Sequence, residues 1–86
     1  MTITDIKQQI IDVIQRKYSA RKDEPGIESI IRSEVSSILD KNRRERQINT
    51  YSSVWVRKNN GVFRIKANVY PTFIGALIKF DFNVQL

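Results

Sequence analysis

The sequence contains no cysteine and no histidine, and these two absences exclude several kinds of functional site. Without cysteine the chain has no disulfide framework, zinc finger, iron–sulfur cluster or thiol nucleophile. Without histidine it has no Ser–His–Asp triad and no imidazole general base. Sites that depend on a thiol or an imidazole are therefore excluded.

Long apolar runs are also missing. The longest is Phe73–Ile78, six residues including Gly75, whereas a membrane-spanning helix needs roughly 20. Near the N-terminus, isoleucines alternate with polar side chains such as Asp5 and Lys7, so we expect no signal peptide and no membrane association. The three glycines and two prolines form no linker, which favours one domain over residues 1–86.

The sequence does contain enough apolar residues for a small core, and its positive charge is unevenly distributed. Ile, Val, Leu and Phe together number 27, about a third of the 86 residues, whereas disordered chains fall below ~20%. Residues 1–40 hold 6 basic and 7 acidic side chains, and residues 41–86 hold 9 basic and 2 acidic. The net charge of +6 therefore belongs to the second half, which we expect to be a solvated surface or to face an acidic partner.

Residues 1–42 show the periodicity of two amphipathic helices. The first is predicted over Ile3–Tyr18, with Thr4 as N-cap and Asp5 in the first turn. The second is predicted from Glu24 or Pro25 to Lys41. The apolar stripes are Ile6, Ile10, Val13, Ile14 and Tyr18 in the first helix and Ile27, Ile30, Ile31, Val35, Ile38 and Leu39 in the second.

Residues 48–86 instead alternate with the period of β-strands. We predict strands over Ile48–Lys58, Val62–Tyr70 and Leu77–Leu86, preceded by an exposed basic connection at residues 41–47. Because helices precede strands without alternating, the predicted fold class is α+β, with two helices packed on a three-stranded antiparallel sheet. The last strand has a markedly apolar face, which must be covered by the helices or by another chain.

The dipeptide Asn60-Gly61 predicts a two-residue hairpin turn, since both residues tolerate a positive φ. This register keeps apolar and polar residues on separate faces, whereas a three-residue loop would mix them. It pairs Val54 with Ala67, Trp55 with Lys66, Val56 with Ile65 and Arg57 with Arg64.

The polar sheet face is then a basic surface around Trp55, and three interpretations of it stay open. It could bind nucleic acid, with cations for phosphates and the indole for base stacking. It could be a solvated face on which Trp55 packs over Lys66. It could contact an acidic protein surface. The candidate residues are Arg57, Lys58, Arg64 and Lys66 around Trp55, Arg43, Arg44 and Arg46 nearby in sequence, and Tyr51 and Tyr70 at the margins.

No arrangement of side chains predicts catalysis. The second half of the chain offers only Glu45 and Asp81 as carboxylates, and a catalytic pair or metal cluster would need several convergent ones. We therefore expect no enzymatic activity, no metal, no cofactor and no small-molecule substrate.

The order of the predicted elements resembles a known family over residues 27–86. An apolar helix, a connection and a strand hairpin ending at Pro71 are followed by an alternating strand to the C-terminus, and the last two strands read Phe63–Pro71 and Ile78–Leu86. This pattern resembles the C-terminal domain of contractile tail sheath proteins of bacteriophages and related injection machines. Sheath proteins are several hundred residues long, whereas this sequence has 86 residues and resembles only their terminal domain. A small tail or baseplate component built from the same domain is therefore an alternative within the family.

The resemblance implies a structural role in a virion or, during assembly, in the host cytoplasm. Domains of this family join their neighbours by strand addition, so the chain is expected to form homo-oligomers or to bind other structural subunits with acidic surfaces. The implied interface is the last strand, with Ile78, Phe80, Phe82, Val84 and Leu86. The alternative function is a small nucleic-acid-binding module that uses the basic, Trp-containing sheet face.

Overall fold

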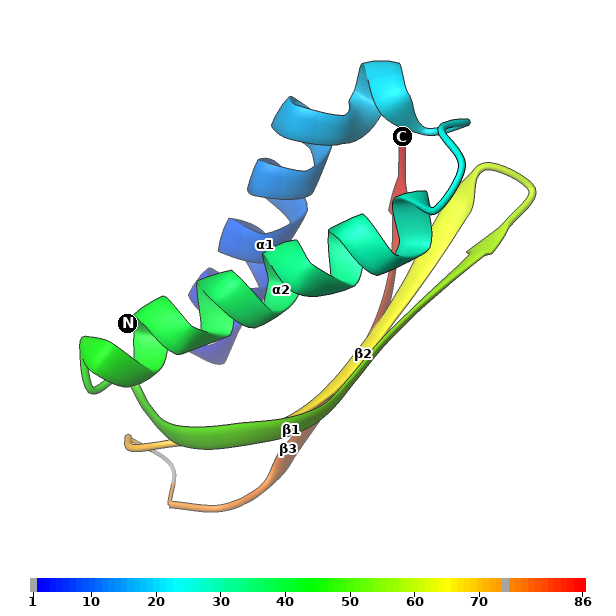
Figure 1. The fold of residues 1–86 in the computed structure, drawn as a ribbon. Coiled ribbons are helices and arrows are strands. Elements are labelled where there is room, and N and C mark those ends of the chain that lie inside the picture. The colour runs from blue at the N-terminus through cyan, green and yellow to red at the C-terminus, as the bar shows by residue number, and fades with distance from the viewer. Residues whose placement is uncertain (1, 74) are drawn as a thin grey trace.

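The computed structural model describes residues 2–73 and 75–86 and has the expected α+β architecture. Both helices lie on one face of a three-stranded antiparallel sheet with strand order β1-β2-β3 (Figure 1). The elements are α1 (Ile3–Tyr18), a 3₁₀ turn (Ser19–Arg21), α2 (Ile27–Arg44), β1 (Ile48–Asn59), β2 (Val62–Pro71) and β3 (Ile78–Gln85).

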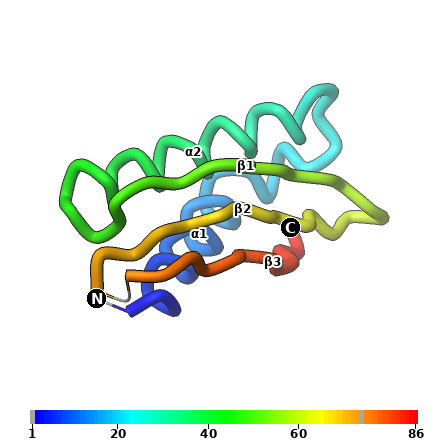
Figure 2. Tube along the Cα trace, turned by 90° about the horizontal axis from the view of Figure 1, so that it is seen from below, coloured from blue at the N-terminus to red at the C-terminus, as the bar shows by residue number. Residues whose placement is uncertain are grey.

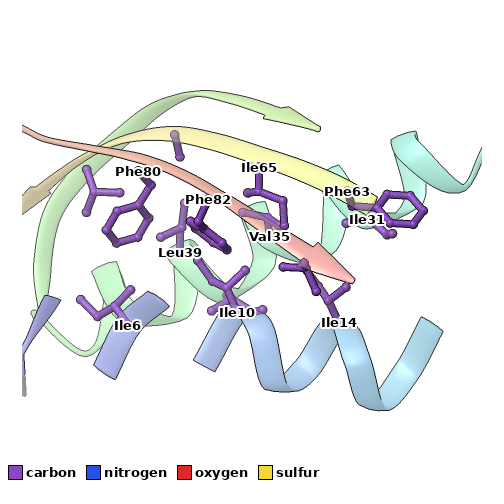
Figure 3. Packing of buried hydrophobic residues seen from close by; sticks show 14 of the residues in the cluster. Ile6, Ile10, Ile14, Ile31, Val35, Leu39, Phe63, Ile65, Phe80 and Phe82 are labelled. Atoms are coloured by element: carbon purple, nitrogen blue, oxygen red, sulfur yellow. The ribbon is translucent and has the colours of Figure 1, made fainter. Parts of the chain in front are cut away.

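The core lies between the sheet and the two helices. Ile6, Ile10 and Ile14 of α1 point toward the sheet, and Figure 3 shows them below the phenylalanines of β3. Phe63 and Ile65 of β2 are fully buried. Each such side chain contributes about 1.5–3 kcal/mol through loss of apolar contact with water, so packing stabilises helices rich in β-branched residues. Val13 and Ile30, predicted in the core stripes, are only partly buried at its rim.

Helix α1 begins with a capping box at Thr2, so the prediction of Thr4 as N-cap was wrong. The Asp5 N–H donates to Thr2 Oγ1 at 3.2 Å, and the Thr2 N–H donates to Asp5 Oδ2 at 2.8 Å. The Thr2 N–H and hydroxyl hold the pKa of the Asp5 carboxyl below its usual value. Asp5 thus occupies the N3 position of a reciprocal cap, which satisfies two backbone donors at the helix start.

Helix α2 begins and ends later than predicted. It starts after Gly26, whose φ is +77°, and it continues to Arg44, so most of the predicted exposed connection is its last turn. The helix is closed by a Schellman motif in which the Gln47 N–H donates to the Asn42 carbonyl at 2.9 Å and the Arg46 N–H to the Arg43 carbonyl at 3.1 Å. Arg46 has the left-handed conformation that usually signals glycine, with φ 61°, which is why the sequence pattern missed this ending.

Strand β1 contains two irregularities that its sequence did not predict. Ser52 pairs with Asn68 and Trp55 with Lys66, so Ser53 and Val54 share one position opposite Ala67, and Ser53 has φ 56°. The predicted pairing of Val54 with Ala67 is therefore replaced by a β-bulge, although the turn at Asn60-Gly61 and the other pairs are confirmed. A second register shift lies between residues 48 and 50.

The bulge at Ser53 turns Tyr51 away from the basic sheet face. Instead of lying at the margin of that face, Tyr51 faces α2, where its hydroxyl donates to Asp40 Oδ1 at 2.8 Å. Burial, together with this bond to Asp40, raises the pKa of the Tyr51 phenol. An extra residue in a strand reverses which face its neighbours occupy, so the pattern of alternation before the bulge could not be extrapolated from the pattern after it.

The two helices are joined by polar contacts at both ends of their antiparallel pairing. At one end Glu34 Oε1 accepts hydrogen bonds from Lys17 Nζ at 2.8 Å and from the Tyr18 hydroxyl at 3.0 Å. At the other end the buried Asn42 donates from Nδ2 to Gln9 Oε1 at 3.1 Å. The Lys17 ammonium, with help from Tyr18, keeps the pKa of Glu34 below its usual value although partial burial opposes this.

Replacing Arg46 by glycine should stabilise the protein. A side chain in the left-handed conformation costs about 1 kcal/mol that glycine does not incur, so we expect the melting temperature to rise by about 4–8 °C in a domain of this size. Arg46→Ala removes the same guanidinium but keeps the steric strain, so it should not raise the melting temperature. Equal gains from both variants in thermal denaturation would contradict the account of this turn.

Replacing Glu34 by glutamine should make the protein less stable at neutral pH but not in acid. A carboxyl group whose pKa is lowered by folding stabilises the fold above its unfolded pKa, and this contribution is lost as the pH falls through its folded pKa. The melting temperature of Glu34→Gln should therefore lie about 2–4 °C below wild type at pH 7 and converge with it near pH 2–3. A gap that does not change with pH would exclude an ionic origin.

Candidate interaction surfaces

The face of the sheet away from the helices carries the polar residues of all three strands. Since strand pairing is antiparallel and regular on this side of the bulge, these residues form rows across the sheet. Figure 2 shows the three strands side by side, with β2 in the middle. The two central rows are Trp55–Lys66–Asp81 and Arg57–Arg64–Asn83, and Lys79 lies beside Asn68 in the next row.

One cation of this face is neutralised within the sheet. Arg64 binds Asp81 on the neighbouring strand through two hydrogen bonds, from Nε to Oδ1 and from Nη2 to Oδ2, each 2.8 Å long. The guanidinium keeps the pKa of the Asp81 carboxyl below its usual value. A two-pronged pair of this kind fixes the planes of both groups, so Arg64 is already engaged when a ligand arrives.

The indole of Trp55 is also engaged. Lys66 Nζ lies 5.2 Å from the centroid of the Trp55 ring, within the range of a cation–π contact. Trp55 is nevertheless 37% exposed. This contact is the arrangement expected if Trp55 packs over Lys66 on a solvated face, and it occupies an aromatic face that a nucleobase would need for stacking.

Two cations of the sheet face make no internal interaction. Arg57 and Lys79 have neither an ion pair nor a side-chain hydrogen bond within residues 2–73 and 75–86. A polar hollow beside the hairpin turn is lined by Arg57, Arg64 and Asn83. The exposed positive charge of the sheet face therefore lies at Arg57 and Lys79, on either side of the paired residues Arg64 and Asp81.

The remaining basic residues that were predicted around Trp55 do not lie on the sheet face. Lys58 was expected beside Trp55, but the alternation of β1 turns it to the helix side, where Nζ bonds the Lys22 carbonyl at 2.8 Å and Asp23 Oδ1 at 3.1 Å. Arg43 pairs with Asp40 at 3.0 Å and lies over the Tyr51 ring.

The other two connection arginines lie apart from the sheet face as well. Arg44 lines a groove between the helices, and Arg46 forms the turn before β1. The basic half of the sequence is therefore not one surface. Sequence reasoning placed Asp81 between Lys79 and Asn83 on a polar strand face, but it did not include Lys79 and Asp81 among the candidate residues around Trp55.

The apolar side chains of β3 belong to the protein's own core. Phe80, Phe82 and Val84 are buried, and Ile78 and Leu86 are partly buried and pack against the same cluster. Lys7 of α1 covers the Phe82 ring from 5.2 Å. The helices thus cover the apolar face of this strand, and a neighbouring chain would meet its backbone rather than these side chains.

The backbone of β3 is open on the side away from β2. A two-residue turn makes Asn59 and Val62 a hydrogen-bonded pair, and alternation from there directs the N–H and C=O groups of Lys79, Asp81 and Asn83 away from the ladder. Within the described part of the chain, no other backbone group forms a hydrogen bond with these outward-facing groups of β3. The one side-chain hydrogen bond to this edge in the same part of the chain runs from Gln15 Nε2 to the Gln85 carbonyl, at 3.4 Å.

The opposite edge is closed by contrast. Strand β1 is interrupted by two bulges, and α2 runs along it (Figure 2). The Lys58 N–H, which points outward by the same alternation, donates to Glu28 Oε2 of α2 at 3.0 Å. Bulges and side-chain caps of this kind prevent another strand from pairing, so the two edges of this sheet differ in what they can bind.

Among the residues that the structure describes there is neither a cluster of metal-ligating side chains nor a membrane-spanning helix. No group of three or more acidic residues is placed to hold a metal ion in that part of the chain. No helix there is long and apolar enough to cross a membrane. Comparison with known proteins gives no match to a family model, to a curated protein or to a solved structure.

Proposed function

We propose that this chain is a non-enzymatic structural subunit that assembles by pairing the open edge of β3 with a neighbouring chain. The observation that carries the proposal is the difference between the two sheet edges. The eight pairs that join β2 to β3 run without interruption from Val62–Gln85 to Val69–Ile78, and β3 contains neither proline nor a bulge. A regular unprotected edge is a template for another strand.

Between identical copies, such pairing joins β3 to β3. The β1 edge is bulged and covered by α2, so it is not a second acceptor, and the pairing closes around a two-fold axis at a dimer. The result is one continuous six-stranded sheet with the helices of both copies on the same side. Growth beyond the dimer then needs a different surface, for which the unpaired cations Arg57 and Lys79 on the open sheet face suit an acidic structural partner.

This proposal agrees with what the resemblance to contractile tail sheath domains implies. A small component of a tail or baseplate with one free edge and one protected edge would add its strand to a single neighbour and would meet further subunits through other surfaces. The assignment to such an assembly remains our proposal, and it rests on the geometry of β3 together with that resemblance.

Nucleic-acid binding through the sheet face is less well supported. A stacking platform needs an accessible ring face and cations free to meet phosphates. Here Lys66 covers the Trp55 ring and Asp81 engages Arg64. Only Arg57 and Lys79 remain for phosphates, which favours contact with an acidic protein surface over an oligonucleotide.

Asn83→Pro tests the role of the β3 edge. Proline removes an N–H that points away from β2, so the strand keeps its own ladder but cannot accept a full partner strand. We expect wild type to convert from monomer to dimer with rising concentration in light scattering, and the dissociation constant of Asn83→Pro to be about tenfold higher or more.

The matched control is Asn83→Ala, which loses the same amide side chain but keeps the backbone donor, and which should dimerise like wild type. Circular dichroism melts check that both variants are folded. A wild-type chain that stays monomeric at millimolar concentration would overturn the proposal, and so would an Asn83→Pro variant that is folded and dimerises as tightly as wild type.

A further inference from the structure

The outer surface of the helical layer contains a groove that is separate from the sheet face and borders the core. It runs between α1 and α2 on the side away from the sheet, with a cavity volume of about 460 Å³. Each helix contributes one stripe of side chains at helical spacing. The apolar floor is formed by two side chains, one from each helix. These are the partly buried Val13 of α1 and the buried Ile38 of α2.

The carboxylates of this groove already have partners. Glu34 accepts from both Lys17 and Tyr18, and Asp12 accepts a hydrogen bond from Gln8 at 2.8 Å. Lys17 compensates the charge of Glu34, whereas Asp12 keeps its negative charge because Gln8 is neutral. Neither carboxylate forms an ion pair with Arg16, Lys41 or Arg44, although the nearby charge of Arg16 also helps to lower the pKa of Glu34.

Three cations of the groove have no such partner. Arg16, Lys41 and Arg44 form neither ion pairs nor side-chain hydrogen bonds within the described residues, and all three are exposed. Arg16 comes from α1 and the other two from the last turns of α2. These three cations outnumber Asp12, the one carboxylate among the described residues lining the groove that forms no ion pair, so the groove keeps a net positive charge to which both helices contribute.

We propose that this groove binds an acidic amphipathic segment of a partner protein. An apolar side chain of the segment seats on Val13 and Ile38, and flanking carboxylates reach Arg16, Lys41 and Arg44. Grooves between paired helices accept a third helix through apolar anchors at i, i+3 or i+4 spacing, and charge complementarity along the rim fixes its orientation. This surface is separate from the β3 edge, so it gives the subunit a second and chemically different contact.

A synthetic peptide of about 14 residues, with leucines on one helical face and glutamates on both flanks, is a suitable probe. We expect calorimetry at low salt to show binding that weakens with added salt. The double variant Arg16→Glu/Lys41→Glu should bind the peptide about tenfold more weakly or worse. The matched control, Arg32→Glu/Arg46→Glu, makes the same charge change at exposed positions outside the groove and the sheet face and should bind as wild type does.

Polyglutamate of the same charge distinguishes a docking groove from general attraction between opposite charges. It should bind much more weakly than the amphipathic peptide, because it cannot fill the apolar floor. The proposal is overturned if the peptide does not bind, if polyglutamate binds equally well, or if the two double variants lose affinity equally. None of the groove substitutions touches β3, so dimerisation in light scattering tests the proposed function separately.

Discussion

The hydrogen bond from the Lys58 N–H to the Glu28 carboxylate closes one edge of a sheet that has only three strands. A sheet this narrow has one interior strand, so most of its free backbone groups lie on edges, and each edge must be capped, distorted or paired. Helix α2 and two bulges close the β1 edge. No equivalent arrangement exists at β3 within the described residues, and the interactions we propose for this protein follow from that difference.

The distribution of charge depends on the same architecture. Strand alternation sends Arg57, Arg64 and Lys66 to the open face, whereas the extension of α2 to Arg44 carries other cations to the helical layer. A sequence whose second half has a large positive excess therefore presents two separate basic surfaces. One is flat and partly neutralised by Asp81, and the other surrounds an apolar groove. Surfaces with such different shapes suit different partners.

The sequence predicted the regular parts of the fold because their patterns are local. Helical and strand periodicities gave the order of the elements, and Asn60-Gly61 gave the hairpin register. The end of α2 and the bulge in β1 were missed because a residue other than glycine adopts a positive φ at each. Arg46 ends α2 and Ser53 forms the bulge, and neither residue type signals the left-handed conformation it adopts. The bulge then moved Tyr51 from the expected sheet face to Asp40, and only tertiary packing fixes that choice.

The candidate surfaces were predictable only in part for the same reason. The grouping of Trp55, Arg57, Arg64 and Lys66 followed from the register, but the partners that neutralise Arg64 and cover Trp55 depend on side-chain contacts across strands. The openness of the β3 edge could not be derived from β3 alone. It depends on where the two helices lie, which local patterns do not determine.

Amide hydrogen exchange across β3 tests most directly whether this edge is the assembly surface. In dilute protein we expect fast exchange at Asp81 and Asn83, whose N–H groups point away from β2, and slow exchange at Phe80 and Phe82, whose N–H groups point toward β2. At high concentration the Asp81 and Asn83 amides should become protected as a second copy pairs with the strand. Protection of these two amides that is the same at every concentration, or exchange that stays fast at the highest one, would contradict the central claim.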